Sequence, residues 1–274
     1  MQNREYLYGI NTILSLLNVN AGKRRIYKIY IIENKFHSDR IKQICLLAKN
    51  KDIPAITVGE EFFTGILDQS LFSGSSGESG KSYFKLSEEL ASSQGIAAEV
   101  SGYNYSDFEG DLKSGFSKNG ILTVLDGVTD VGNFGSILRN CCAFGISGVI
   151  IPADRSVSVN RRVSKISSGA TEEIRIYRVI NLRRSIDMLK ESGFWIYGSV
   201  TDSEANVKAV GSIEYNFPVA IVFGGEQNGL SRLVRNNCDF LIKINIEQSI
   251  QSLNVSVASG IILYTAYLQK SLKN

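Results

Sequence analysis

Short apolar runs alternate with amphipathic segments along the chain, and the alternation is most regular after residue 119. Buried strands of parallel sheets are nearly continuous apolar runs, whereas helices repeat their apolar positions every 3.6 residues. The expected strands are 120–128, 147–152, 174–179, 194–200, 218–226 and 239–246, and the expected helices are 133–145, 159–170, 182–193, 230–237 and 253–269. Strands that alternate with helices predict an α/β fold with a parallel sheet covered by helices.

The first hundred residues predict a smaller α/β unit. Its expected helices are 9–19, 39–53 and 60–72, its expected strands are 25–32 and 54–59, and 85–103 is expected to form a helix and then a strand. The polar, Gly- and Ser-rich stretch 104–120 has no periodicity and is typical of a linker. We therefore predict domains at 1–103 and 119–274, joined by a linker at 104–118.

Composition narrows the function classes. The chain has 274 residues, of which 43% are apolar and 21% charged, so it can bury a sizeable core. No apolar run approaches the roughly 20 residues of a membrane span, and the N-terminus lacks the apolar core of a signal peptide. We expect a soluble, cytoplasmic protein. The four cysteines form no CxxC pair, so we expect buried free thiols and no metal.

A possible phosphate loop at residues 75–83, SSGESGKSY, ends in Gly-Lys-Ser. A Walker A loop needs a first Gly separated by four residues from the Gly of Gly-Lys-Ser, and Ser75 stands there instead. No apolar strand precedes the loop, so a Ser/Gly-rich surface loop is the better interpretation. The net charge of +3 does not by itself predict nucleic-acid binding, and the only histidine, His37, is expected in an exposed loop.

Three expected strand ends are followed by Gly and small polar residues. Their sequences are DGVTDVGNFGSILRN (126–140), VFGGEQNGLS (222–231) and SIQSLNVSVASG (249–260). Glycines allow close backbone approach, and a Gly-rich bend with one acid, Glu226, suits hydrogen bonding to a ribose or an amino group. Taken singly, Asn133 could be a helix cap, Glu226 could lie in a tight turn, and Ser252 with Asn254 could cap the last helix. Three such loops in one sheet favour a ligand site, because ligands bind at the carboxyl ends of parallel strands.

Together, these motifs resemble those of the SpoU (TrmH-type) branch of the SPOUT RNA 2′-O-methyltransferases. The matches are DGVTDVGNFGSILR, FGGEQNGL and SLNVSVA, and the correspondence extends over 119–270. The N-terminal YGINTILSLL and SQGIAAEV resemble the start and end of the substrate-binding domain in enzymes that methylate a guanosine of 23S ribosomal RNA.

The resemblance implies a fold, a cofactor and partners. It implies a parallel-sheet SPOUT domain with a deep trefoil knot, a small N-terminal α/β (L30e-like) substrate-binding domain, and a site at the interface of a homodimer. The implied reaction transfers a methyl group from S-adenosylmethionine to a ribose 2′-hydroxyl of RNA, with 23S ribosomal RNA as the expected partner. Tyr6, Tyr8 and the cluster Lys23-Arg24-Arg25 are candidates for RNA contact, although the tyrosines could equally pack in the core.

The resemblance also implies roles for individual residues. The implied catalytic residues are Arg139, Asn133, Glu226, Ser252 and Asn254, and the implied cofactor-binding residues are Gly224, Gly229, Ile244, Ile246 and Leu253. A guanidinium stays protonated at neutral pH, so Arg139 is a poor base. It could instead bind the adjacent phosphate and stabilise the developing alkoxide, while the proton goes to water or phosphate.

The chain departs from the family pattern at three places. Val131 follows Asp130 where a proline is usual, residues 245–248 replace the usual Pro-Met-x-Gly, and Ser93 stands where histidine is common. These changes could loosen the cofactor pocket. The alternatives are therefore a transfer-RNA ribose 2′-O-methyltransferase, an RNA-binding or ribosome-assembly protein that has lost catalysis, and a P-loop ATPase.

Overall fold

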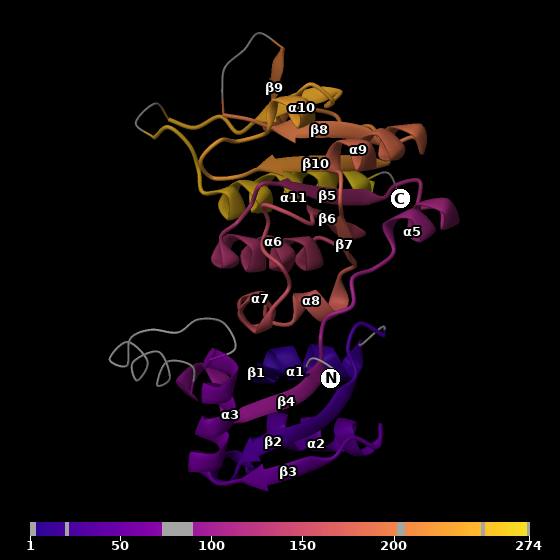
Figure 1. Cartoon of the computed structure of the whole chain (residues 1–274). Coiled ribbons are helices and arrows are strands. Elements are labelled where there is room, and N and C mark those ends of the chain that lie inside the picture. The colour runs from indigo at the N-terminus through magenta and orange to yellow at the C-terminus, as the bar shows by residue number, and fades with distance from the viewer. Residues whose placement is uncertain (1–3, 20–21, 73–89, 202–205, 248–249, 273–274) are drawn as a thin grey trace. The chain divides into compact units, whose positions relative to one another are not determined.

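A computed structural model describes residues 4–19, 22–72, 90–201, 206–247 and 250–272 (Figure 1). The possible phosphate loop at 75–83 lies outside these residues. Contacts divide the chain into two compact units. The first comprises Met1–Asn104 with Val159–Glu173, and the second comprises Tyr105–Ser158 with Ile174–Asn274.

The second unit is built on a seven-stranded sheet in which every paired neighbour is parallel. In the order β7-β6-β5-β10-β8-β11-β9, its strands are Ile176–Val179, Gly148–Pro152, Ile121–Asp126, Val219–Gly224, Trp195–Ser199, Phe240–Lys243 and Val207–Ala209. The predicted α/β class with a parallel sheet is confirmed. The sequence pattern did not predict the edge strand β9, because its three residues carry no usable periodicity.

Helices cover this sheet. They are α5 (Phe108–Ser114), α6 (Val131–Ala143), α9 (Leu182–Glu191), α10 (Arg232–Arg235) and α11 (Val255–Leu272). The apolar side chains of β5, β6 and β10 are fully buried, as expected for strands with helices on both faces. The long helix α11 packs against α6 and β10.

The expected linker at 104–118 contains helix α5 rather than irregular chain. Phe108 is buried and meets the ring of Tyr177 edge to face at 5.7 Å. The Tyr177 hydroxyl donates a hydrogen bond to Asp111 at 2.9 Å, which fixes the same helix from its polar side. The sequence pattern did not predict α5, because seven residues with one buried position show no clear helical repeat.

The first unit contains a four-stranded sheet in the order β1-β4-β2-β3, formed by Arg4–Tyr8, Ile96–Ser101, Ile26–Ile32 and Ala55–Val58. Its helices include α1 (Ile10–Asn18), α2 (Asp39–Lys49) and α3 (Glu60–Phe72). Alternate residues of β2 belong to two different clusters: Ile29 and Ile31 pack with α1 and α2, whereas Tyr30 and Ile32 pack with α3. The sequence pattern did not predict strand β1.

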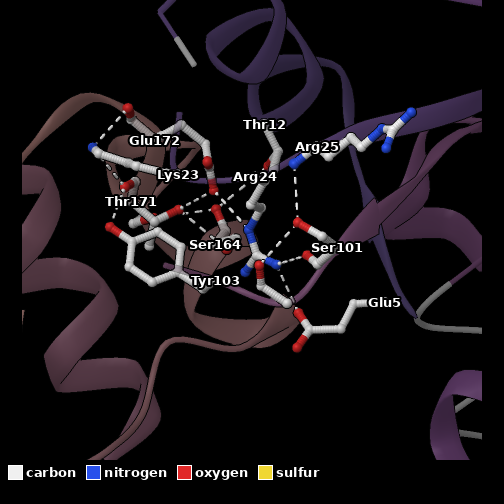
Figure 2. Close-up of polar contacts among 12 residues, drawn as sticks. Glu5, Thr12, Lys23, Arg24, Arg25, Ser101, Tyr103, Ser164, Thr171 and Glu172 are labelled. Carbon is white, nitrogen blue, oxygen red and sulfur yellow. Dashed lines mark hydrogen bonds and ion pairs between the residues drawn. The ribbon is translucent and has the colours of Figure 1, made fainter. Parts of the chain in front are cut away.

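Residues 159–173 form α7 (Arg161–Ile166) and α8 (Ala170–Glu173) and pack within the first unit. One helix was predicted for 159–170. Ser168 and Gly169 interrupt it, because both have left-handed φ values, 55° and 91°. In Figure 2 the side chains of Lys23 and Arg24 reach α8. This grouping was not anticipated, and the linear domain bounds 1–103 and 119–274 stay a prediction.

None of the described helices combines the length and the apolar character needed to cross a membrane. Of the four cysteines, Cys141 is buried and the other three are half-buried, and all four are free thiols.

We expect Phe108→Ala to lower the free energy of unfolding by about 3–5 kcal/mol, the usual cost of truncating a buried phenylalanine. Urea denaturation measures the change, and the neighbouring exposed Glu109→Ala serves as the control, with an expected change below about 0.5 kcal/mol. Equal, small effects of both substitutions would mean that α5 does not pack as described.

Candidate active site

The loop after β5 is organised by Asp130, which caps helix α6. Its carboxylate accepts a hydrogen bond from the backbone N–H of Asn133 at 2.7 Å. The sequence also allowed Asn133 to be the cap of this helix, but Asp130 caps it instead. The Asn133 side chain is therefore not used for capping. Val131 occupies the first helical position, where proline would be favoured, and the helix forms there because Asp130 supplies the cap.

The loop after β10 lies against the loop after β5. Gly224 pairs with Asp126 in the parallel register, so both loops begin at the same level of the sheet. A Cβ on Gly224 would lie 2.1 Å from the carbonyl carbon of Gly229, and one on Gly225 would lie 2.3 Å from the carbonyl oxygen of Gly127. Only glycine fits at either position, because the backbones are in direct contact.

The third loop ends at Asn254, which caps helix α11. Its Oδ1 accepts hydrogen bonds from the backbone N–H of Ser256 at 2.8 Å and from the Ser256 hydroxyl at 2.7 Å. The amide of Asn140 on α6 donates to the carbonyl oxygen of Ser256 at 2.9 Å and to the hydroxyl of Ser259 at 3.0 Å. These bonds hold the start of α11 beside α6.

One hydrogen-bonded chain joins the three loops. The amide of Asn254 donates to Oδ1 of Asn133 at 3.0 Å, and the amide of Asn133 donates to Oε1 of Glu226 at 2.5 Å. Each amide donates to the next residue in the series, so this series of hydrogen bonds ends on the carboxylate of Glu226. The structure thus brings together three of the five predicted catalytic residues, which are 121 and 93 positions apart along the chain.

The other two predicted catalytic residues lie outside this chain of bonds. Arg139 and Ser252 are both exposed. Among the described residues, neither side chain has a hydrogen bond or an ion pair. Arg139 follows Asn133 by six positions on α6, which turns the two side chains to different faces of that helix.

A cavity of about 580 Å³ opens beside Glu226, at the carboxyl ends of β5, β6 and β10. Its lining includes Asp126, Asp130, Asp154, Arg155, Glu226 and Gly229. The sequence motifs did not indicate the first four as site residues. Asp154 and Arg155 follow strand β6, so the rule that ligands bind at the carboxyl ends of strands was a signal that could have found them.

The predicted cofactor-binding residues are placed around β10 and β11. Gly224 ends β10, and Gly229 has the left-handed φ of 59°. Ile244 and Leu253 are half-buried and Ile246 is 37% exposed, and none of the three lines the cavity. Of the unusual third-motif residues, Asn245 and Glu247 are exposed, whereas Gln248 lies outside the described residues.

Two thiols of the second unit are poor nucleophiles. Burial raises the pKa of Cys141, on α6, to about 12, and it raises the pKa of Cys238 to about 12 as well. Both stay protonated at neutral pH, so thiolate chemistry is excluded for them. The candidate site offers the amide donors of Asn133 and Asn254 and the carboxylate of Glu226. The guanidinium of Arg155 lines the same cavity as Glu226. Such groups suit the orientation and electrostatic stabilisation of a hydroxyl-bearing substrate.

The N-terminal candidates for RNA contact separate into two groups. Tyr8, Lys23 and Arg24 are buried, so they cannot contact RNA in this fold. Arg25 is exposed and Tyr6 is half-buried. Ser93, at the position where histidine is common, is fully buried, and its hydroxyl donates to the carbonyl oxygen of Leu90 at 2.6 Å.

Two family models match the chain. The SpoU rRNA Methylase family matches residues 120–264, more than half of the chain, and the model described as RNA 2'-O ribose methyltransferase substrate binding matches residues 6–70.

Relatives and solved structures agree with these matches. A Bacillus subtilis protein, YacO, named for the TrmH family of tRNA/rRNA methyltransferases, is 32% identical over 272 residues, 98% of each chain. A protein of the same family name from Staphylococcus aureus is 43% identical over 65% of this chain and 71% of its own. The fold is similar to that of an AdoMet-bound rRNA methyltransferase from Sinorhizobium meliloti, with a TM-score of 0.72, 19% identity, and coverage of 96% and 87% of the two chains.

We expect Gly224→Ala to lower the free energy of unfolding by about 1–3 kcal/mol or more, because the new methyl group overlaps the backbone of Gly229. Gly211→Ala is the matched control. A Cβ there meets nothing within 4 Å, so its effect should stay below about 1 kcal/mol. Thermal unfolding of both variants gives the comparison, and a fully stable Gly224→Ala protein would disprove the backbone contact.

Proposed function

This chain belongs to the SpoU rRNA methylase family, and on that premise we propose that it transfers the methyl group of S-adenosylmethionine to a ribose 2′-hydroxyl of RNA. As a member of that family, it is an RNA methyltransferase. The observation that carries the specific proposal is the chain of hydrogen bonds from Asn254 through Asn133 to Glu226, which takes one residue from each motif.

The loops fit the proposed cofactor. A Cβ on Gly229 would meet nothing within 4 Å, so the backbone there is open to a ligand, and Ile246 exposes apolar surface after β11. We propose that Gly224, Gly229, Ile244, Ile246 and Leu253 hold S-adenosylmethionine. The AdoMet-bound structure from Sinorhizobium meliloti supports this choice of cofactor. S-adenosylmethionine supplies a methyl group on a positively charged sulfur, which accepts attack by an oxygen nucleophile.

The residues of this chain orient the nucleophile. The Glu226 carboxylate accepts from Asn133 through one oxygen, and its remaining lone pairs can accept a hydrogen bond from the target ribose. Asn254 holds Asn133 in the one amide orientation that keeps this direction of donation. Ser252 is exposed two positions before Asn254 and provides a further hydroxyl for the ribose or the cofactor. Fixing the attacking oxygen in line with the methyl group supplies much of the rate enhancement.

Arg139 provides the positive charge. Its guanidinium stays protonated at neutral pH, so it binds the phosphate next to the target ribose and stabilises the negative charge that develops on the 2′-oxygen. The proton of the 2′-hydroxyl passes to water or to a phosphate oxygen. The exposure of Arg139 supports this role, because the guanidinium remains available to a bound RNA.

We propose 23S ribosomal RNA, at a guanosine, as the substrate. The match of residues 6–70 to a substrate-binding model supports an RNA-holding domain, and the exposed Arg25 with the half-buried Tyr6 are its candidate contacts. The relatives' names cover both tRNA and rRNA, so transfer RNA is the rival substrate. A catalytically inactive RNA-binding protein is the other rival, favoured by Glu247 in the unusual third motif.

We further propose a homodimer and a knotted C-terminal segment. Val257, Ile261, Tyr264 and Leu268 are exposed on α11 at spacings of four, three and four residues, so they share one apolar face. A second copy of the chain would cover that face. The packing of α11, the helix that follows β11, against α6 supports a trefoil knot.

Transfer of radiolabelled methyl from S-adenosylmethionine to large-subunit ribosomal RNA and, separately, to bulk transfer RNA tests the function. Label at one ribose 2′-oxygen of ribosomal RNA is the expected result. Label on transfer RNA alone would select the rival substrate. Binding of ribosomal RNA without label on either RNA would select the inactive RNA-binding protein.

We expect Arg139→Ala to lower methyl transfer by about 10²-fold or more, the usual cost of removing one stabilising charge, with unchanged melting temperature and cofactor affinity. Arg139→Lys should keep part of the activity if charge, rather than the guanidinium fork, is what matters. The exposed Arg184→Ala on α9 is the control. Near-normal transfer by Arg139→Ala would remove this residue from the mechanism.

A further inference from the structure

The cavity beside Glu226 is only partly used by the proposed reaction. Its charged lining consists of four carboxylates and one guanidinium, those of Asp126, Asp130, Asp154, Glu226 and Arg155. Its volume of about 580 Å³ lies within the range of roughly 300–1,000 Å³ that is usual for small-molecule sites. All of its lining residues belong to the second unit, so the cavity is formed within that unit.

Three of the four carboxylates already have partners in the fold. Asp126 and Asp130 each accept a hydrogen bond from a backbone N–H, both at 2.7 Å, and Glu226 accepts from the series of amides that joins the three loops. Within the described part of the chain, the side chains of Asp154 and Arg155 have no hydrogen bond or ion pair. These two are therefore the charged groups of the wall that remain for a ligand.

Residues 153–157 form the turn that carries both side chains, and it is anchored at each end. Its first N–H donates to the carbonyl oxygen of Val179 on β7 at 2.8 Å, and its last, that of Val157, donates to the carbonyl oxygen of Val128 at 3.4 Å. Between them the Ser156 hydroxyl donates to the carbonyl oxygen four residues earlier at 2.6 Å. All of these bonds lie inside the second unit, so that unit by itself holds the turn at the cavity.

The charge balance of the wall restricts its occupant. Four carboxylates against one guanidinium leave the wall negative, so it repels a phosphate group. Ionised carboxylates only accept hydrogen bonds, so they favour a neutral group that is rich in N–H donors. Pro152 and Leu182 add apolar surface to the lining, which suits the face of a flat ring. A nucleobase combines a flat ring with N–H donors at its edge.

One base fits the two remaining charged groups better than the others. Guanine has N–H donors at the adjacent positions N1 and N2, which match the two oxygens of one carboxylate. Its O6 and N7 are the acceptors that an arginine binds through two parallel hydrogen bonds. Adenine and cytosine each offer one amino group, and uracil offers one N–H. Each of these bases therefore leaves part of Asp154 or Arg155 without a partner.

We propose that this cavity holds the guanine of the target nucleotide, with Asp154 accepting from N1–H and N2–H and Arg155 donating to O6 and N7. The inference rests on the proposed function and deepens it, because it assigns the choice of base to two residues outside the three motifs. Glu226 lines the same cavity, so the base and the ribose of one nucleotide are bound side by side. Asp154 and Arg155 do not contact the reacting atoms; they determine which nucleotide is methylated.

The cofactor is the rival occupant, because its positively charged sulfur also suits a negative wall. Of the five proposed cofactor-binding residues, only Gly229 lines the cavity. The cofactor is therefore expected beside the cavity rather than in it.

The test pairs changes in the protein with changes in the target base. The substrate is a fragment of large-subunit ribosomal RNA that contains the mapped target guanosine. Inosine, which lacks the 2-amino group, or 7-deazaguanosine, which lacks the N7 acceptor, replaces that guanosine. The kcat/KM of methyl transfer is measured for the wild type, Asp154→Asn and Arg155→Gln. The control variants are Glu191→Gln and Arg184→Gln, which remove exposed charges of α9 that do not line the cavity.

We expect the wild type to methylate guanosine with a kcat/KM about 10- to 100-fold higher than inosine, the usual range for one bidentate contact to a base. Asp154→Asn should lose about this factor on guanosine and no longer distinguish inosine from it, and Arg155→Gln should behave likewise toward 7-deazaguanosine. Both variants should keep their melting temperature and cofactor affinity, because both side chains are exposed. The controls should retain the discrimination of the wild type.

Several outcomes would overturn the proposal and leave the reaction intact. They are equal methylation of inosine and guanosine by the wild type, unchanged discrimination by both variants, and a mapped target other than guanosine. A loss of cofactor affinity of about tenfold or more in Asp154→Asn would place the cofactor in the cavity instead.

If the wild type labels no RNA, the proposed reaction fails, and binding of free nucleosides then decides the role of the cavity. Saturation-transfer NMR with guanosine, inosine and adenosine needs no methyl transfer. A guanosine signal that exceeds the other two in the wild type, and that Asp154→Asn abolishes, would support the guanine site. Equal signals for the three nucleosides, or a guanosine signal that the substitution leaves unchanged, would reject it.

Discussion

Direct backbone contact between the loops after β5 and β10 is the constraint on which the candidate site depends. Gly225 lies against Gly127 across the two loops, and Gly224 lies against Gly229 within the loop after β10, so close that a Cβ at 224 or 225 would overlap main-chain atoms. The parallel register sets the level of the contact, because Gly224 stands opposite Asp126. Because the two loops begin at the same level and their backbones touch, a side chain of one loop can bond a side chain near the other. The Asn133 amide donates to Glu226 in this way.

The same polar side chains serve helix ends and site geometry. Asp130 caps α6 and leaves the Asn133 amide available for Glu226. Asn254 uses one atom to cap α11 and the other to hold Asn133. A helix cap has a defined place and orientation, so a side chain anchored in this way is positioned without further support. Fold stability and preorganisation of the site therefore share these few residues.

The first unit uses its charges differently. Lys23 and Arg24, candidates for RNA contact in the sequence, are buried against α8. Burial raises the pKa of Glu172, and the nearby Arg24 opposes that shift. Charges that lie inside cannot recognise a substrate directly. They can only determine how the segment carrying them is held.

Periodicity and turn chemistry determined most of the elements, the parallel α/β class and the three motifs, since each depends on residues close together in the chain. They also suggested that Asn133, Glu226 and Asn254 belong to one site, although not how these residues bond. Tertiary structure alone decided that 108–114 is a packed helix, that Ser168 and Gly169 break a helix, and that 159–173 joins the first unit. A hydrophobic pattern reports which side of an element is buried but not which partner buries it, and an ion pair between Arg24 and Glu172 spans a separation that no local spacing encodes.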